Sequence, residues 1–379
     1  MQFRDYQICK NCIMDTTDPK IIFDDQGQCD HCNNFYANIL PNWHPDNDSE
    51  KEIMEIADKI KKYGKNKTHD CILGISGGID SSYLTDIVVE KMGLRPLLYH
   101  VDAGWNTQQA VTNIERMVGY YDLDLHTDVI NWKEMQDLQL SFFKAQVPTL
   151  DTPQDHSYFS SLYNFAIKNK FKYVLTGANY STECIREPLE WIYHTSDLRQ
   201  TLDIHKKFGT RPLETFPTAD ILKFKIYYRF MKGLKIVKPL NYFPYEMEAA
   251  VETLSKKYGW MPYRHKHHES RFTKFFEAYW LPNKFGFDKR KVHFSSLILT
   301  EQMTREEALK RIQEPEYDQA SIHDDFEFVA TKLDIEVKDL RAIMEAPNKK
   351  YSDYKNKMWL ISLGTMVLKL LGGERGNFR

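Results

Sequence analysis

One short segment, residues 70–92, constrains the fold of this 379-residue chain more than any other. Residues 70–73 are mostly apolar and follow a turn rich in Lys, Asn and Thr, which predicts a buried strand. From about Asp80 onward, apolar residues recur at helical spacing. The small residues Ser76, Gly77 and Gly78 lie between them and let the backbone approach an anion at the positive end of a helix dipole. The segment therefore predicts a strand, a phosphate-type loop and a helix N-terminus.

Further strands and helices alternate after this segment. We expect strands at 96–101, around 125–127 and at 171–176, and helices at 50–63 and 107–121. This alternation predicts an α/β fold with a doubly wound parallel sheet, whose ligands bind at the carboxyl ends of the strands. The loops 76–82, 102–106 and 176–183 each follow an expected strand, so they predict one shared nucleotide site.

The loop Ser-Gly-Gly-Ile-Asp-Ser-Ser at 76–82 is neither a Walker A sequence nor a dinucleotide fingerprint. It resembles the pyrophosphate loop (PP-loop) of the ATP pyrophosphatases, which include GMP, asparagine and NAD synthetases and the tRNA thiolases. These enzymes have the adenine nucleotide alpha hydrolase-like fold and split ATP into AMP and pyrophosphate. The resemblance implies that ATP is bound by Ser76, Gly77, Gly78, Asp80, Ser81, Ser82, Val101, Asp102, Thr176 and Gly177. The alternative is a helix cap that binds no ligand.

Magnesium is implied by the same resemblance. Asp80 would lie near the ion, and the segment 177–183 resembles the third loop of NAD synthetase, in which a glutamate six positions after a glycine binds the metal. Glu183 is therefore expected to be a second Mg²⁺ ligand, since magnesium prefers carboxylates and phosphate oxygens. The alternative for Glu183 is an ordinary solvated acid at a helix start.

Four of the six cysteines form two Cys-x-x-Cys pairs, separated by sixteen residues. This spacing predicts a zinc-ribbon-like knuckle with the ligands Cys9, Cys12, Cys29 and Cys32. Four sulfur ligands close a tetrahedral site, so the Zn²⁺ ion would be structural. An iron–sulfur cluster or metal-free thiols are the alternatives, and His31 is expected to be a bystander.

The C-terminal third of the sequence indicates which family within the ATP pyrophosphatases the chain resembles. The blocks 263–276, 284–290, 293–299 and 302–308, together with Cys-x-x-Cys-Ile-Met-Asp-Thr-Thr-Asp-Pro at 9–19, resemble the N-acetyl sugar amidotransferase family. The resemblance implies conversion of an acetamido group of a free or nucleotide-linked sugar to an acetamidino group. The family acts on pseudaminic or legionaminic acid derivatives of flagellin and on lipopolysaccharide sugars. Residues 1–45 would be the zinc knuckle, 46–250 the PP-loop domain, and 251–379 a mainly helical region for substrate or partner.

This reading assigns roles to donor-rich segments of the C-terminal third. With Ser76 and Asp80, Lys266 and Arg271 are expected to be catalytic, and the substrate is expected to contact His267, His268, Glu269, Lys289 and Arg290. Lysine and arginine would form a basic rim for the carboxylate of a nonulosonic acid or the phosphate of its carrier. The alternative is a solvated basic loop.

The sequence shows no glutaminase site, because residue 2 is not a Cys nucleophile and no Gly-x-Cys-x-Gly elbow is present. Ammonia must therefore come from another source. The family resemblance implies a separate glutaminase with a cyclase-like companion. The aromatic stretch 224–234 is expected to be core or the face of a homodimer. A net charge of −2 predicts no nucleic-acid partner, and the lack of a long apolar run or signal-peptide core predicts a cytoplasmic protein without membrane contact.

Two alternatives to the amidotransferase stay open. A tRNA thiolase needs cysteines beyond a zinc module, and only Cys71 and Cys184 remain, the latter beside Glu183. A non-enzymatic zinc scaffold that binds nucleotide would leave the loop ends without a catalytic use.

Overall fold

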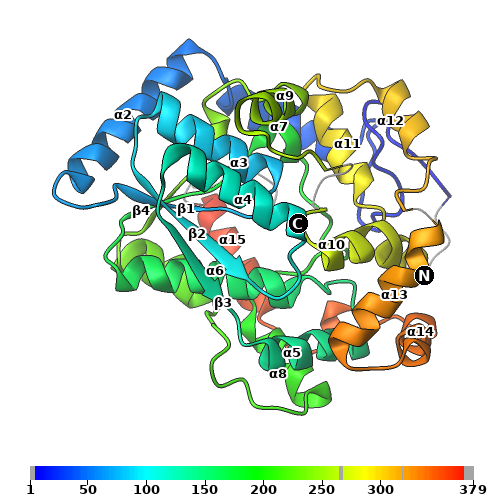
Figure 1. The fold of residues 1–379 in the computed structure, drawn as a ribbon. Helices are drawn as coiled ribbons and strands as arrows, with labels where there is room; N and C mark the ends of the chain where they lie inside the picture. The colour runs from blue at the N-terminus through cyan, green and yellow to red at the C-terminus, as the bar shows by residue number, and fades with distance from the viewer. Residues whose placement is uncertain (1–4, 264–267, 318, 371–379) are drawn as a thin grey trace.

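A computed structural model describes residues 5–263, 268–317 and 319–370. Its centre is a five-stranded sheet in the order β3-β2-β1-β4-β5, and every neighbouring pair is parallel (Figure 1). The strands are β1 (Cys71–Gly74), β2 (Pro96–Asp102), β3 (Leu125–Val129), β4 (Tyr173–Leu175) and β5 (Lys235–Val237). The strand order reverses between β1 and β4, so the predicted doubly wound sheet is confirmed, with its switch point at the carboxyl ends of these two strands.

Helices cover both faces of the sheet and continue into the C-terminal third (Figure 1). The α-helices up to β5 are α1 (Asp30–Asn34), α2 (Asn47–Gly64), α3 (Ile79–Asp86), α4 (Gln108–Tyr121), α5 (Trp132–Lys144), α6 (Thr152–Lys168), α7 (Tyr180–Glu183) and α8 (Leu198–Phe208). Those after it are α9 (Met247–Tyr258), α10 (Arg271–Phe275), α11 (Arg290–Leu299), α12 (Arg305–Arg311), α13 (Gln319–Leu333), α14 (Val337–Glu345) and α15 (Met358–Leu370). Short 3-10 or π-helical turns are η1 (Phe35–Ile39), η2 (Leu40–Asn42), η3 (Ile87–Lys91), η4 (Lys223–Met231), η5 (Pro239–Asn241), η6 (Phe276–Phe285) and η7 (Tyr351–Asp353).

Alternating strand residues build two hydrophobic cores. Leu73 and Leu175 pack with apolar residues of α2, α3, α4 and α9. Ile72 and Val174 point to the opposite face and join a larger core with α5, α6, α8, α10 and α13. Both faces of the sheet are covered in this way at its centre, where β1 and β4 are buried throughout, whereas the edge strand β3 is mostly exposed. The second core runs without interruption into the C-terminal helices.

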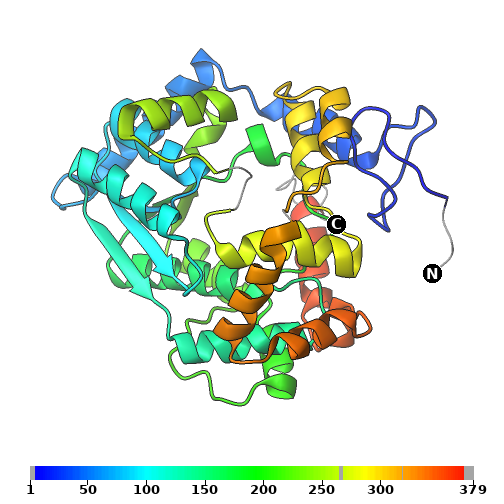
Figure 2. The same cartoon turned by 45° about the vertical axis from the view of Figure 1, so that its right-hand side comes forward.

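The cysteine segment near the N-terminus packs against two helices that follow the sheet. The N-terminal segment lies beside α11 and α12 in both views (Figures 1 and 2). Arg305, the first residue of α12, donates hydrogen bonds to the carbonyl oxygens of Cys9 (2.8 Å) and Cys12 (3.0 Å). The backbone N–H of Ile13 donates to the hydroxyl of Ser295 on α11 at 3.1 Å. The cysteine segment is thus fixed to the helices that follow the sheet domain.

Differences from the expected elements have local causes. Helix α2 begins at Asn47 instead of residue 50, because the Asp46 carboxylate accepts the N–H groups of Asp48 and Ser49 at 3.0 Å each. Strand β5 is not among the expected strands: only Ile236 and Val237 of its three residues are apolar, and it lies at the sheet edge beside β4. Among the described residues, none of the helices combines the length and apolar character needed to cross a membrane.

We predict that Gly77→Ala destabilises the protein, whereas Gly119→Ala does not. Gly77 has φ +81°, and an added Cβ would lie 2.5 Å from the Ala110 carbonyl oxygen. The strain should cost about 1–3 kcal/mol of unfolding free energy in urea titrations. Gly119 lies inside α4 with nothing within 4 Å of an added Cβ, so alanine there should be neutral or stabilising by up to about 1 kcal/mol. Equal stability of the Gly77 variant and wild type would contradict the strained turn.

Candidate active site and cysteine cluster

The loop between β1 and α3 is closed by two serine hydroxyls. The Ser76 and Ser81 hydroxyl oxygens lie 3.2 Å apart, and Ser81 also accepts the backbone N–H of Ser76 at 3.2 Å. Gly78 is the N-cap residue of α3, and its N–H donates to the Ser76 hydroxyl at 3.3 Å. The turn therefore brings Ser76, Gly78 and Ser81 to the start of a helix, where the helix dipole favours an anion.

Asp80 is held by two residues that the sequence did not single out. Its Oδ1 accepts hydrogen bonds from the Tyr245 hydroxyl at 2.6 Å and from the Asn179 side-chain amide at 3.1 Å. Burial, followed by the nearby Asp80 charge, raises the pKa of Tyr245 well above its usual value, and Glu183 adds to the effect. The Tyr245 hydroxyl is thus bonded to Asp80 and lies within the electrostatic influence of Glu183.

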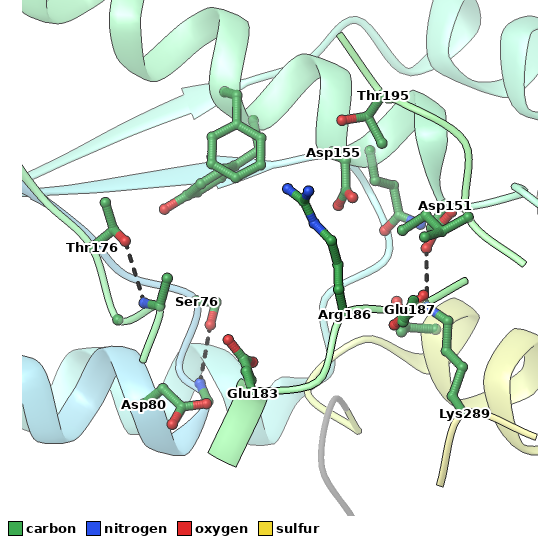
Figure 3. Close-up of a pocket in the computed structure, with 18 of the residues that line it drawn as sticks. Ser76, Asp80, Asp151, Asp155, Thr176, Glu183, Arg186, Glu187, Thr195 and Lys289 are labelled. Carbon is green, nitrogen blue, oxygen red and sulfur yellow. Dashed lines mark hydrogen bonds and ion pairs between the residues drawn. The ribbon is translucent and has the colours of Figure 1, made fainter. Parts of the chain in front are cut away.

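The loop after β4 packs closely against the loop after β1. A Cβ at Gly177 would lie 3.1 Å from the Asp80 carbonyl carbon, so glycine permits the close approach. Thr176 accepts the N–H of Ala178 at 3.3 Å, and Asn179 caps α7 by accepting the N–H of Thr182 at 2.8 Å. Ser76, Asp80, Thr176 and Glu183 consequently line the same side of one cavity (Figure 3).

Two predicted ATP ligands have other partners. Ser82 is buried, and its hydroxyl accepts the indole N–H of Trp260 at 3.1 Å. One Asp102 oxygen accepts the Gly104 N–H at 2.8 Å and the Asn106 amide at 3.2 Å. Neither residue lines the cavity, whereas Val101 does. The structure therefore gives no reason to assign the Ser82 and Asp102 side chains to phosphate or adenine.

The cavity extends from the phosphate-type loop to α11 and α15, with a volume of about 1570 Å³. Its wall combines the carboxyl ends of β1, β2 and β4 with one face of α6, the segment 182–196, η4 and the C-terminal helices. Ligand pockets for single drug-sized molecules span about 300–1,000 Å³, so this cavity has room for a nucleotide and a second substrate.

The predicted C-terminal residues separate into different environments. Lys266 and His267 lie outside the described residues. Glu269 reaches the loop, with its Oε1 3.5 Å from the Ser76 hydroxyl, and its carbonyl accepts the Thr107 N–H at 3.0 Å. The His268 ring lies 3.6 Å from the Glu316 carboxylate. The structure therefore brings Glu269 to the nucleotide-type site.

Arg271 requires a correction. Its guanidinium group donates to Asp325 at 2.9 Å and lies 4.0 Å from the ring centre of Phe328. Arg271 does not line the cavity. These contacts join α10 to α13, so the catalytic role expected for Arg271 is replaced by a structural one.

The expected basic rim also requires a correction. Lys289 lies 2.8 Å from Glu277, 3.3 Å from Glu187 and 3.4 Å from Asp151. Arg290 pairs with Asp288 at 2.7 Å. Both basic side chains line the cavity, but the carboxylates of these acidic residues balance their positive charges. They do not by themselves present a positive surface to an anion.

The cysteines form the one group among the described residues with the donor spacing of a metal site. The sulfur atoms of Cys9, Cys12, Cys29 and Cys32 all lie within 4.8 Å of one another. Contacts of 3.6 Å join Cys12 to Cys29 and Cys29 to Cys32, and 3.9 Å joins Cys9 to Cys32. A tetrahedron with Zn–S bonds of about 2.3 Å has S···S edges of about 3.8 Å. The four thiols therefore fit a tetrahedral metal ion.

His31 and the remaining cysteines have separate environments. His31 pairs with the buried Asp18 at 2.9 Å. Burial raises the pKa of the Cys184 thiol to about 12, and burial likewise raises that of Cys71. Cys184 lies 3.7 Å from the Ser296 carbonyl oxygen. Both thiols should be protonated at neutral pH and therefore poorly nucleophilic.

Comparison with known proteins identifies the C-terminal region. Residues 269–367 match the family model of the LPS biosynthesis protein WbpG-like, C-terminal domain. An uncharacterized protein of Methanocaldococcus jannaschii is 32% identical over 118 residues, which are 31% of this chain. The chain spans 40% of the length of that relative. The C-terminal helices thus resemble a lipopolysaccharide biosynthesis domain.

Solved structures with partial similarity include an NH3-dependent NAD synthetase from Campylobacter jejuni. It is 16% identical with a TM-score of 0.29, and the alignment covers 79% of this chain and 98% of that one. The NMN synthetase of Francisella tularensis is 15% identical, with 61% and 93% coverage and a TM-score of 0.29. A predicted tRNA methyltransferase subunit of M. jannaschii is 13% identical, with 49% and 73% coverage and a TM-score of 0.27. With TM-scores this low, the superpositions carry no argument about the activity of this protein.

We predict that Cys9→Ser lowers the bound metal to well below one ion per chain and lowers the melting temperature. Loss of one thiolate opens the tetrahedral site, and metal binding contributes directly to the stability of such modules. Metal analysis and thermal unfolding are the measurements. Cys184→Ser is the matched control, because this thiol lies outside the cluster, and its metal content should equal that of wild type. Iron with visible absorbance, or metal-free protein prepared without oxygen, would contradict zinc.

Proposed function

We propose that this protein is an ATP-dependent, AMP- and pyrophosphate-forming amidotransferase. Its substrate would be a sugar that carries an acetamido group, which becomes an acetamidino group. A nonulosonic acid such as a pseudaminic or legionaminic acid derivative, or a lipopolysaccharide sugar, would be that substrate, free or linked to a nucleotide. The nitrogen would come from ammonia.

One observation carries the proposal. The phosphate-type loop at the switch point of the sheet opens into a cavity whose far wall is the region that matches the WbpG-like domain. Glu269, at the start of that region, already contacts Ser76 in the loop. A nucleotide site and a sugar-pathway domain therefore share one cavity, as expected for an enzyme that activates a sugar with ATP.

The proposed chemistry has two steps. The amide oxygen of the sugar attacks the α-phosphorus of ATP, and pyrophosphate leaves with the electron pair of the broken P–O bond. The amide N–H proton is released to solvent as the neutral imidate forms. Ammonia then adds to the imidate carbon, AMP leaves with the C–O electron pair, and the three hydrogens of ammonia are the three N–H hydrogens of the resulting amidinium. Ser76, Gly78 and Ser81 would hold phosphate oxygens through the hydroxyl and backbone donors that bond one another within the loop.

Asp80 and Glu183 would hold the magnesium ion that such a step uses. Their carboxylate oxygens are the hard ligands that Mg²⁺ prefers, and both line the cavity around the Tyr245 hydroxyl. When bound, magnesium neutralises phosphate charge. The hydrogen bonds from Tyr245 and Asn179 orient Asp80 for this role.

A separate glutaminase with a cyclase-like companion is proposed as the ammonia source. Exposed apolar side chains are available for a partner or homodimer contact: Phe230 and Met231 of η4 are 80% and 71% exposed, and Trp359 of α15 is 65% exposed. The thiolase alternative receives no support from the cysteines, since four are clustered and the other two are buried with raised pKa values.

The substrate is found by incubating the protein with ATP, magnesium, ammonium and a panel of acetamido sugars, free and linked to CMP or UDP. Mass spectrometry should show a loss of about one mass unit in one sugar, because oxygen is exchanged for NH. AMP and pyrophosphate should form in equal amounts. Absence of any mass change over such a panel, with ATP intact, would contradict the proposal.

We predict that Asp80→Asn lowers sugar-dependent ATP–pyrophosphate exchange by about a hundredfold or more, since it removes one negative charge from the metal and phosphate site. The substitution keeps an oxygen for the Tyr245 and Asn179 hydrogen bonds, so the melting temperature should change little. Exchange is measured with labelled pyrophosphate. A near-normal rate in a folded variant would remove Asp80 from the assigned role.

The isolated chain should use ammonium salts and fail with glutamine. Initial rates are compared with ammonium chloride and with glutamine, each with and without the proposed glutaminase. Glutamine use should appear only when the partner is added. Efficient glutamine hydrolysis by the isolated chain would show that it has its own glutaminase site.

A further inference from the structure

A group of buried acids lies in the cavity wall away from the phosphate-type loop. Asp151, Glu187 and Glu277 contact Lys289, and the buried Asp155 interacts with the charges of all four. We call these five residues the acidic cluster, and Figure 3 labels Asp151, Asp155, Glu187 and Lys289. Three of the carboxylates lie within 3.4 Å of the Lys289 ammonium group. Burial alone would lower the pKa of Lys289, but the charges of Glu187, Glu277 and Asp151 raise it well above its usual value.

The cluster has more negative charge and more acceptors than Lys289 can match. Four carboxylates face one ammonium group, and Arg186, which extends into the cavity between the cluster and the loop, adds one further positive charge (Figure 3). The Asp151 Oδ1 and Glu187 Oε2 atoms are buried and accept no hydrogen bond from any described residue. Asp151 is only 9% exposed. A buried carboxylate oxygen without a donor is costly, so these two atoms indicate a missing ligand.

The chemistry of the cluster selects the ligand. A phosphate or carboxylate group would be repelled by the excess negative charge, and a neutral hydroxyl would satisfy an acceptor without balancing that charge. Among the described residues, only the cysteines form a group of three or more metal-type ligands within 4.8 Å of one another, so the carboxylates of the cluster are not spaced as a metal cage. Ammonium is a monovalent cation with several N–H donors, like the Lys289 side chain that the cluster already binds. It therefore matches both the charge and the unsatisfied acceptors.

Helix α6 connects the cluster to the nucleotide-type site. Asp151 precedes the helix, and Asp155 and Tyr158 follow at helical spacing on the face that lines the cavity. The Tyr158 hydroxyl packs directly against Gly74, the last residue of β1, so that a Cβ added at Gly74 would overlap it. Asp155 and Tyr158 are separated by about 4.5 Å along the helix axis. A ligand of the cluster would therefore lie near the strand that leads into the phosphate-type loop.

We propose that the acidic cluster is an ammonium-binding site that supplies the nitrogen of the amidotransferase reaction, with Asp155 as the proton acceptor. This inference rests on the proposed function. Asp151 and Glu187 bind the N–H groups of the ion. One N–H bond breaks, its proton moves to an Asp155 oxygen, and its electron pair stays on nitrogen as the lone pair of ammonia. That lone pair attacks the imidate carbon, and AMP leaves with the C–O electron pair.

The electrostatics of Asp155 suit a proton acceptor. Burial, together with the charges of Asp151, Glu187 and Glu277, raises its pKa to about 8, while Lys289 opposes the shift. Tyr158 on the same helix and the guanidinium group of Arg186 are the other ionisable groups beside it. With this pKa, Asp155 is mostly protonated at pH 7 in the empty site, and the positive charge of a bound ammonium ion favours its ionised form. That carboxylate then accepts a proton from an amine far more readily than an ordinary Asp with a pKa of about 3.9.

The first test measures ammonium kinetics in Glu187→Gln and Asp151→Asn. Each substitution removes one charge from the cluster at nearly constant size. The KM for ammonium should rise about ten- to hundredfold, because a charged hydrogen bond to the ion is lost. Sugar-dependent ATP–pyrophosphate exchange, measured without ammonium, should stay within twofold of wild type. Glu248→Gln, at another point of the cavity wall, is the matched control and should leave the KM unchanged.

A variant of the proton acceptor separates binding from proton transfer. Asp155→Asn should lower kcat with ammonium at pH 7, and its activity should recover as the pH rises, because the fraction of free ammonia increases. Loss of structure alone would not produce this recovery. An unchanged ammonium KM in both Glu187→Gln and Asp151→Asn, or a wild-type pH profile for Asp155→Asn, would overturn the ammonium site.

Thallous ion tests the site without any sugar. Crystals of the full chain soaked in thallium(I) acetate should show anomalous density beside Asp151 and Glu187, and the double variant should lose it. Absence of density in wild-type crystals would overturn the cation site. If no acetamido sugar supports exchange while thallium binds, the proposed function fails and the cation site stands, so the two failures are distinguishable.

Discussion

The left-handed turn at Gly77 is the constraint on which the rest of the site depends. It lets β1 pass into α3 while the Gly77 Cα lies against the backbone of Ala110. The loop after β4 can then approach so closely that Gly177 contacts the backbone of Asp80. Since two strand ends meet there, residues distant in sequence orient one carboxylate: Asn179 from the second loop and Tyr245 from beyond β5.

The cysteine segment supports the opposite wall of the cavity. Arg305 binds the carbonyl groups of Cys9 and Cys12, and Ser295 binds Ile13. Helix α11, which lines the cavity, is thereby attached to the metal-type module. The cysteine segment therefore supports this wall through hydrogen bonds, through the ion pair of Lys291 with Asp15 and through apolar packing, and a structural ion among the thiols would act on the wall by the same contacts.

Sequence reasoning succeeded where the signal is local and failed where it depends on tertiary contacts. The strand at 71–74, the helix that starts at 79 and the cysteine group follow from periodicity, small residues and spacing. The role of Tyr245 depends on a hydrogen bond across 165 positions, which no local pattern records. Lys289 lies in a run of basic residues, and that run predicts a positive rim. The acids that surround it come from three other segments of the chain, so their charges could not be combined before the fold was known.

The face of α6 has a consequence for how such an enzyme changes its substrate. Asp155 and Tyr158 belong to one rigid helix, and Tyr158 abuts the end of β1. The rise of α6 and its packing on the sheet thus set the spacing between the acidic cluster and the phosphate-type loop. The far wall of the cavity consists instead of loops and C-terminal helices. Under the proposed function, that wall can be remodelled to admit a different sugar while the distance between the acidic cluster and the phosphate-type loop stays constant. Substrate diversity and reaction geometry are therefore separable properties of this architecture.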